Sequence, residues 1–126
     1  MESKFRVGIN SDWEAIAADG FRQAAAQVFD PLPDLECEYM EDRGDTAIPD
    51  VLNRYDAVVV FAHRFPRESF SGVKRLACIS RWGVGFDRID VEASAEAGVA
   101  VTLTPMGVRR HVAEGIIALI FALAKN

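Results

Sequence analysis

The sequence predicts an α/β fold of the flavodoxin-like type, with an open parallel sheet, helices on both faces and a long apolar helix at the end. Strand-like apolar segments alternate with helical segments along the whole chain, which is the pattern of a parallel sheet. One segment, 57–62 (AVVVFA), is continuously apolar, as expected for a central strand covered on both faces. The 126 residues, half of them hydrophobic, are enough for one domain with its own core.

The first strand and helix are marked by a change of period. Apolar residues alternate over 5–9, and the polar residues 10–12 then signal a helix start. Apolar residues recur at helical spacing over 13–28, and we expect Pro31 and Pro33 to end this helix.

The middle of the chain predicts an edge strand and a central strand. Segment 35–39 alternates apolar residues with Glu, which indicates an edge strand with one solvated face. Segment 49–53 begins with proline and is expected to form a short helix, ahead of the central strand at 57–62. Segment 63–71 is expected to be a polar loop.

Two further strands follow. Segments 76–80 and 99–103 are apolar and strand-like. Between them Asp90 is expected to cap a helix over 91–97, which Gly98 closes.

Composition limits the possible partners. A net charge of −5 argues against nucleic acid, since phosphate binding needs a basic face. Cys37 and Cys78 lie in strand-like apolar runs and are expected to be buried free thiols, and no Cys or His cluster has the spacing of a metal site. The start, 1–10, has no apolar signal core, and the run 115–124 is too short to span a bilayer, so we expect a cytoplasmic protein without a membrane partner.

The loop after segment 76–80 is the most informative for function. Gly83 and Gly85 have no Cβ, so both could adopt φ > 0 and expose successive backbone N–H groups, a nest that binds a carboxylate. The third glycine of a G-x-G-x-x-G dinucleotide fingerprint would fall at Arg88, so this is not such a fingerprint. A tight turn is the alternative interpretation of the two glycines.

Three consecutive segments, GVGFDRID, AGVAVTLTP and VAEGIIALIFAL, together resemble the end of the substrate-binding domain in the D-isomer-specific 2-hydroxyacid dehydrogenase family. The resemblance implies a substrate-binding domain over 1–104 and an apolar interdomain crossover helix over 105–126. That helix would lead toward a nucleotide-binding domain absent from this chain. In the family that second domain carries the cofactor fingerprint and the catalytic Arg, Glu and His, so no catalytic residue is assigned here and this chain alone is expected to be inactive.

The resemblance also implies a function for the whole protein. It would be an NAD(P)-dependent oxidoreductase that interconverts 2-hydroxy acids and 2-keto acids. The cofactor, NAD or NADP, would be bound mainly by the missing domain, and the substrate would be a small 2-hydroxy or 2-keto acid. Because the last helix is apolar on nearly all sides and needs cover, the assembly is expected to be a homodimer. The alternative is a non-catalytic, nucleotide-sensing regulatory module of the same family that acts through protein contacts. Catalytic residues in the second domain would decide between them.

Substrate-binding residues follow from the same resemblance. Val84 and Gly85 would hold the substrate carboxylate through their backbone N–H groups, with Gly83 shaping the turn. His63 and Arg64 lie in the loop after the central strand, which faces the cleft in the family, and an arginine there could bind an anion in bidentate fashion. The alternative is a solvated loop in which Arg64 or Arg67 contacts a nearby acid.

The start of the last helix carries the residues assigned to cofactor binding. Arg109 and Arg110 are expected to precede the regular helix, with His111 at its start, where anions are favoured. The alternative is surface solvation with interdomain salt bridges. Glu114 is expected to order the hinge. Leu103 replaces an Asn that is frequent in the family, which weakens any transfer of substrate choice.

Overall fold

A five-stranded parallel sheet with strand order β2-β1-β3-β4-β5 confirms the predicted flavodoxin-like fold. The computed structural model describes residues 4–41 and 44–125, apart from the side chains of residues 13–15 and 17–18. The strands are β1 (Phe5–Ile9), β2 (Leu35–Tyr39), β3 (Ala57–Val60), β4 (Cys78–Arg81) and β5 (Ala100–Leu103). As predicted, 35–39 is the edge strand and the run of valines is the central one.

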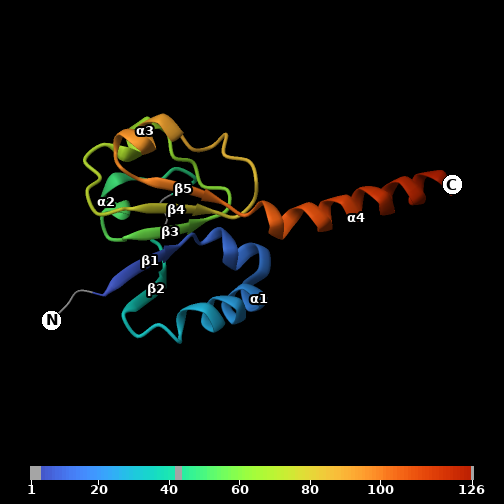
Figure 1. Ribbon diagram of the computed structural model, residues 1–126, viewed down its shortest axis with the longest axis horizontal. Coiled ribbons are helices and arrows are strands. Elements are labelled where there is room, and N and C mark those ends of the chain that lie inside the picture. The colour runs from blue at the N-terminus through green and yellow to red at the C-terminus, as the bar shows by residue number, and fades with distance from the viewer. Residues whose placement is uncertain (1–3, 42–43, 126) are drawn as a thin grey trace.

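Helices lie on both faces of the sheet. Helix α1 covers one face, whereas α2 and α3 cover the other, and α4 extends away from the body at the end where the strands finish (Figure 1). The helical elements are α1 (Asp12–Phe29), α2 (Pro49–Leu52), the 3₁₀ helix η1 (Arg67–Phe70), α3 (Val91–Glu96) and α4 (Pro105–Ala124).

The main core lies between the sheet and the layer formed by α2, η1 and α3. Its fully buried residues include Leu52, Val58, Val60, Phe65 and Ile79. Phe65 and Phe70 belong to the segment 63–71, so the prediction of a polar loop there is wrong. The aromatic side chains turn inward and pack against each other with ring centroids 6.4 Å apart, while the charged residues between them stay exposed.

The packing of α1 differs from the predicted stripe. Ile16 and Val28 are more than half exposed, so neither is buried against the sheet. Trp13 and Ala17, also in the predicted stripe, lie outside the described side chains. Among the side chains of this helix that the structure describes, the half-buried apolar ones are spaced four residues apart and are Phe21, Ala25 and Phe29.

Helix α3 has the predicted start. The Asp90 side chain accepts a hydrogen bond of 2.9 Å from the Ala93 N–H, which satisfies one of the free donors of the first turn. Gly98 has φ +73° and ends the helical segment. The Ser94 hydroxyl then donates to the Val99 carbonyl at 2.6 Å, joining the helix to the start of β5.

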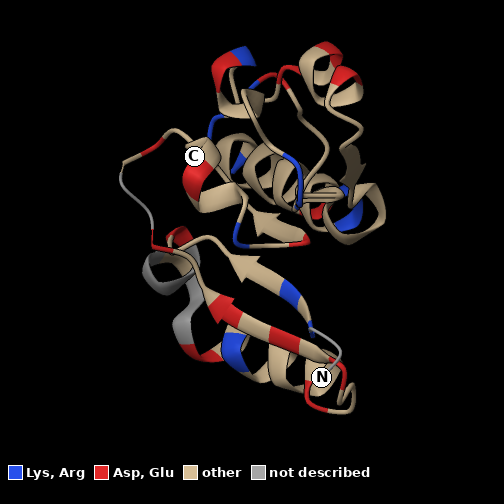
Figure 2. Ribbon diagram, turned by 90° about the vertical axis from the view of Figure 1, so that its left-hand side faces the viewer, with Lys and Arg blue, Asp and Glu red and all other residues tan. Residues whose placement is uncertain are grey.

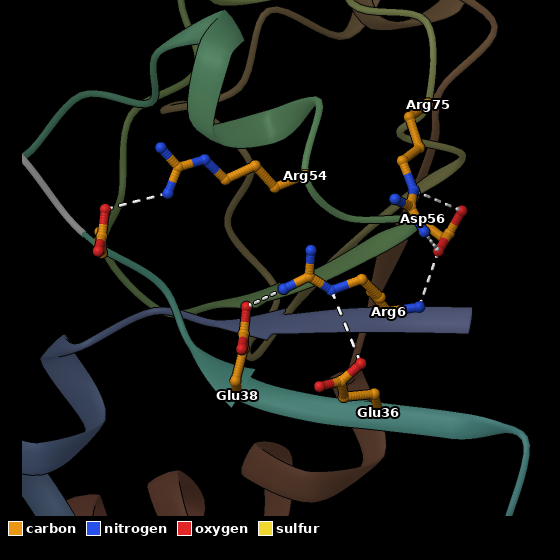
Figure 3. Close-up of polar contacts among 7 residues, drawn as sticks. Arg6, Glu36, Glu38, Arg54, Asp56 and Arg75 are labelled. Carbon is orange, nitrogen blue, oxygen red and sulfur yellow. Dashed lines mark hydrogen bonds and ion pairs between the residues drawn. The ribbon is translucent and has the colours of Figure 1, made fainter. Parts of the chain in front are cut away.

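A charged network joins the edge strand to the centre of the sheet. Figure 2 shows acidic positions along β2 beside the basic position of β1, and Figure 3 shows their contacts. The Arg6 guanidinium pairs with Glu38 and lies 3.9 Å from Glu36, while the Arg6 backbone N–H donates to Asp56 at 2.7 Å. Arg75 donates to both oxygens of Asp56, at 3.1 and 2.8 Å. These hydrogen bonds, those from Arg75 first, hold the pKa of the Asp56 carboxyl below its ordinary value.

No residue of α4 is buried, and its apolar side chains are exposed over most of its length. Within residues 4–41 and 44–125, no helix combines the length and the hydropathy that crossing a membrane would require.

Candidate functional site

The loops that follow β1, β3 and β4 meet at one edge of the sheet, because parallel strands end on the same side. Two open clefts lie at this edge, on either side of the glycine loop formed by residues 83–87. The first has a volume of about 400 Å³ and is lined by Gly83, Val84 and Gly85 together with apolar side chains. The second has a volume of about 450 Å³ and a polar lining that includes Arg64 and Arg88.

The glycine loop is hydrogen-bonded to Thr104, the residue directly before α4. The Gly83 N–H donates to the Thr104 hydroxyl at 2.8 Å, and the Thr104 N–H donates to the Gly83 carbonyl at 2.9 Å. Gly83 has φ +128°, a conformation that favours glycine. Gly85 does not have a positive φ, so the expectation that both glycines use this region is wrong for Gly85. In the described part of the chain, no acceptor engages the Val84 and Gly85 amides. Their donors are therefore available to an anion.

Arg81 is a residue of this site that the sequence analysis missed. Its guanidinium lies over the Phe61 ring at 5.8 Å from the centroid, and Nη1 donates to the Trp82 carbonyl. A Cβ on Gly83 would lie 1.5 Å from Arg81 Nη1, so the guanidinium occupies space that only glycine leaves open. The available signal was a cation at the end of a strand directly ahead of the glycines.

Arg64 lies at the second cleft. Its backbone is held by hydrogen bonds from the Ala47 N–H to its carbonyl and from its own N–H to the Asp45 carbonyl, at 2.9 and 2.8 Å. Its side chain is exposed and lines the cleft beside Arg88, whose guanidinium donates to the Ala62 carbonyl at 2.8 Å. Arg64 is therefore placed where an anion could reach it.

Arg67, three residues further along the chain from Arg64, pairs with an acid. It donates to both carboxylate oxygens of Glu96, with the longer contact at 2.9 Å. This exposed bidentate pair joins η1 to α3, and it lowers the pKa of the Glu96 carboxyl.

His63 is buried, with 5% of its surface exposed, and it lines neither of the two clefts. Its Nδ1 lies 2.9 Å from the Asn10 side-chain nitrogen, and its ring packs edge-on against Phe65 with centroids 5.9 Å apart. The side chain joins the ends of β1 and β3, and its assignment to substrate binding stays a prediction.

The residues assigned to the cofactor lie inside α4 rather than ahead of it. The helix begins at Pro105, so Arg109, Arg110 and His111 occupy its second turn, beyond the range over which a helix N-terminus favours anions. Arg110 pairs with Glu114 at 2.7 Å, and His111 Nδ1 lies 3.9 Å from the same carboxylate. All three side chains are exposed, and by themselves they do not enclose a dinucleotide. Their role in cofactor binding stays a prediction.

No group of three or more His, Cys, Asp or Glu side chains within the described residues could hold a metal ion. Cys37 and Cys78 are unpaired thiols and are partly rather than fully buried. Burial raises the pKa of the Cys37 thiol to about 11, so this thiol stays protonated at neutral pH.

Comparison with known proteins gives a consistent family. The family model of the D-isomer specific 2-hydroxyacid dehydrogenase catalytic domain matches residues 14–116. The glyoxylate reductase of Pyrococcus furiosus is 33% identical over 69 residues, which cover 55% of this chain and 20% of that protein. The D-3-phosphoglycerate dehydrogenase of Methanocaldococcus jannaschii is 30% identical over 109 residues, covering 79% of this chain and 21% of that protein.

A solved structure extends the likeness to three dimensions. The D-lactate dehydrogenase of Aquifex aeolicus, determined in complex with NAD and lactic acid, is 25% identical with a TM-score of 0.69. The match covers 93% of this chain and 33% of that one. The chain thus spans about a fifth of the two relatives and a third of the solved structure.

Proposed function

Because the chain belongs to the D-isomer-specific 2-hydroxyacid dehydrogenase family, we propose that it forms the substrate-binding part of an NAD(P)-dependent oxidoreductase. This enzyme interconverts 2-hydroxy acids and 2-keto acids. The observation that carries the proposal is the glycine loop, whose Val84 and Gly85 amides are available beside a cleft while Gly83 is anchored to Thr104. Such amides bind a carboxylate, which every 2-hydroxy acid and 2-keto acid carries.

The position of the glycine loop indicates which steps the chain's residues carry out and which the cofactor carries out. The chain's own residues bind and orient the substrate carboxylate, and the nicotinamide of the cofactor supplies or accepts the hydride when it is bound. NAD is the cofactor that the Aquifex relative supports. The exposed apolar surface of α4 supports a homodimer, because soluble monomers rarely expose a patch of that size. A cytoplasmic location stays a prediction.

A binding experiment tests the proposal on this chain. Pyruvate added to the ¹⁵N-labelled protein is expected to shift the Val84 and Gly85 amide resonances, because their N–H groups would donate to its carboxylate. Unmoved resonances at these two residues, with pyruvate in large excess, would contradict the proposal.

Arg64 lines the second cleft, so Arg64→Ala tests whether a ligand held at the loop amides also reaches that cleft. A charge-assisted hydrogen bond from Arg64 to the ligand would be lost at a cost of about 1.5–3 kcal/mol. Arg67→Ala is the matched control, because the Arg67 guanidinium is engaged by Glu96. If the two variants bind pyruvate equally well, Arg64 has no part in the site. Turnover of pyruvate with NADH by the 126-residue chain is not expected, because its sequence holds no G-x-G-x-x-G fingerprint.

A further inference from the structure

The cleft beside the glycine loop combines one cation with an apolar wall. Apart from the loop itself, the described residues that line it are Arg81 and the apolar Ile16, Phe61, Trp82 and Val108. These residues come from α1, the ends of β3 and β4, and the first turns of α4. A volume of about 400 Å³ falls within the range of small-molecule sites and leaves room for a ring.

The cation lies at the carboxylate end of the cleft. Arg81 curls back over the glycine loop, where the missing Cβ of Gly83 makes room for its guanidinium. Its stacking on Phe61 and its hydrogen bond to the Trp82 carbonyl hold it there. A carboxylate bound by the Val84 and Gly85 amides would therefore meet a guanidinium at the same loop, and guanidinium groups suit carboxylates.

The remaining wall suits an apolar group and no second charge. Phe61 is 36% exposed and Trp82 is 38% exposed, and both side chains line the cleft. Among the side chains that the structure describes, no lysine or acidic residue lines it. A phosphate or second carboxylate placed against this wall would lose its hydration without gaining a partner, whereas an apolar group would be removed from water.

We propose that this cleft binds the side chain of the substrate and selects 2-keto and 2-hydroxy acids that carry a bulky apolar group, aromatic or branched aliphatic. Short and phosphorylated acids are disfavoured. The inference rests on the proposed function, because the carboxylate bound at the glycine loop is what directs the rest of the molecule into the cleft. Phe61 and Trp82 are the specificity-determining residues.

Three probes test the selection: phenylpyruvate, pyruvate and 3-phosphoglycerate. Each is titrated into the ¹⁵N-labelled chain while the Val84 and Gly85 amides and the Trp82 indole are followed. Phenylpyruvate is expected to bind roughly tenfold more tightly than either other acid, because its ring is buried against the wall. It alone is expected to shift the Trp82 indole.

Two variants test whether the apolar wall of the cleft contacts the ligand. Phe61→Ala and, separately, Ile16→Gln are expected to reduce the preference for phenylpyruvate over pyruvate severalfold. Ile16 is 55% exposed, so Ile16→Gln is expected to leave the fold intact. It therefore tests the wall even if Phe61→Ala disrupts folding. Phe86→Ala is the matched control, because Phe86 is a half-exposed aromatic residue of the same loop that does not line the cleft, and it should leave the preference unchanged.

The outcomes separate this inference from the proposed function. Equal affinities for phenylpyruvate and pyruvate, with the loop amides shifted by both, would overturn the apolar selection and leave carboxylate binding standing. A preference for phenylpyruvate that survives both wall variants would place its ring elsewhere and also overturn the inference. If no probe moves the loop amides, the proposed function fails and the inference fails with it.

Discussion

Replacing Gly83 by alanine should destabilise the protein through backbone strain. Gly83 has φ +128°, a region in which a side chain is rarely found, and holding a residue in such a conformation costs about 1–3 kcal/mol. The new Cβ would also lie 1.5 Å from Arg81 Nη1, so the guanidinium must leave its place over Phe61. We expect the free energy of unfolding to fall by about 1–3 kcal/mol, mostly from the backbone term.

Urea unfolding followed by circular dichroism measures this loss. The matched control is Gly85→Ala in the same loop, where φ is not positive and the new Cβ would lie 3.2 Å from an Asp87 oxygen that can move. This control is expected to change stability by no more than about 0.5 kcal/mol. The double variant Arg81→Ala with Gly83→Ala separates the two causes, because removing Arg81 relieves the steric clash and leaves the backbone strain.

Two results would refute the reasoning. Equal stabilities for Gly83→Ala and Gly85→Ala would show that φ at Gly83 carries no strain. Full recovery in the double variant would show that the clash with Arg81, rather than the backbone, causes the loss.

Other predictions concern the network, the core and the last helix. Asp56→Asn should lower the free energy of unfolding by about 1–3 kcal/mol through lost charged hydrogen bonds from Arg75. The folded-state pKa of Asp56 is depressed, so the stability difference between the wild type and Asp56→Asn should be complete at neutral pH and shrink as the pH falls through that pKa. Urea unfolding midpoints of both proteins from pH 7 to 3 measure this difference. A difference that stays constant over this range would contradict the prediction. Gly8→Ala should cost about 1–3 kcal/mol in thermal or urea unfolding, since its Cβ would lie 2.7 Å from Met40 Cγ, and an unchanged stability would mean that the core yields freely. Light scattering should find a dimer for the whole chain and a monomer for residues 1–108, and a monomeric whole chain with intact helicity would remove the case for association through α4.

Much of the fold could be predicted because its signals are local. The alternation of strand and helix, the edge position of 35–39 and the Asp90 cap all depend on residues within a few positions of one another. The segment 63–71 was mispredicted because its composition is polar, although its two phenylalanines are buried under the sheet. Whether an aromatic side chain is buried depends on the space that the rest of the folded chain leaves in the core, and the composition of a segment carries no information about that space.

The candidate site was predictable only in its location. The spacing of Gly83 and Gly85 indicated an anion-binding loop at the end of a strand, but which of the two adopts φ > 0 depends on the pairing of Gly83 with Thr104, across 21 positions. The burial of His63 against Asn10 spans 53 positions, and no periodicity or spacing announces such a contact.

The sequence by itself therefore determined the class of fold and the order of its elements, since propensity, capping and hydrophobic period act over short stretches of chain. Only the tertiary structure decided that Arg81 folds back onto Phe61 and that the cleft beside the loop has an apolar wall. The physical reason is that the wall joins side chains from the first helix, two strand ends and the last helix, and such a surface exists only once the parallel strands have brought their ends to one edge.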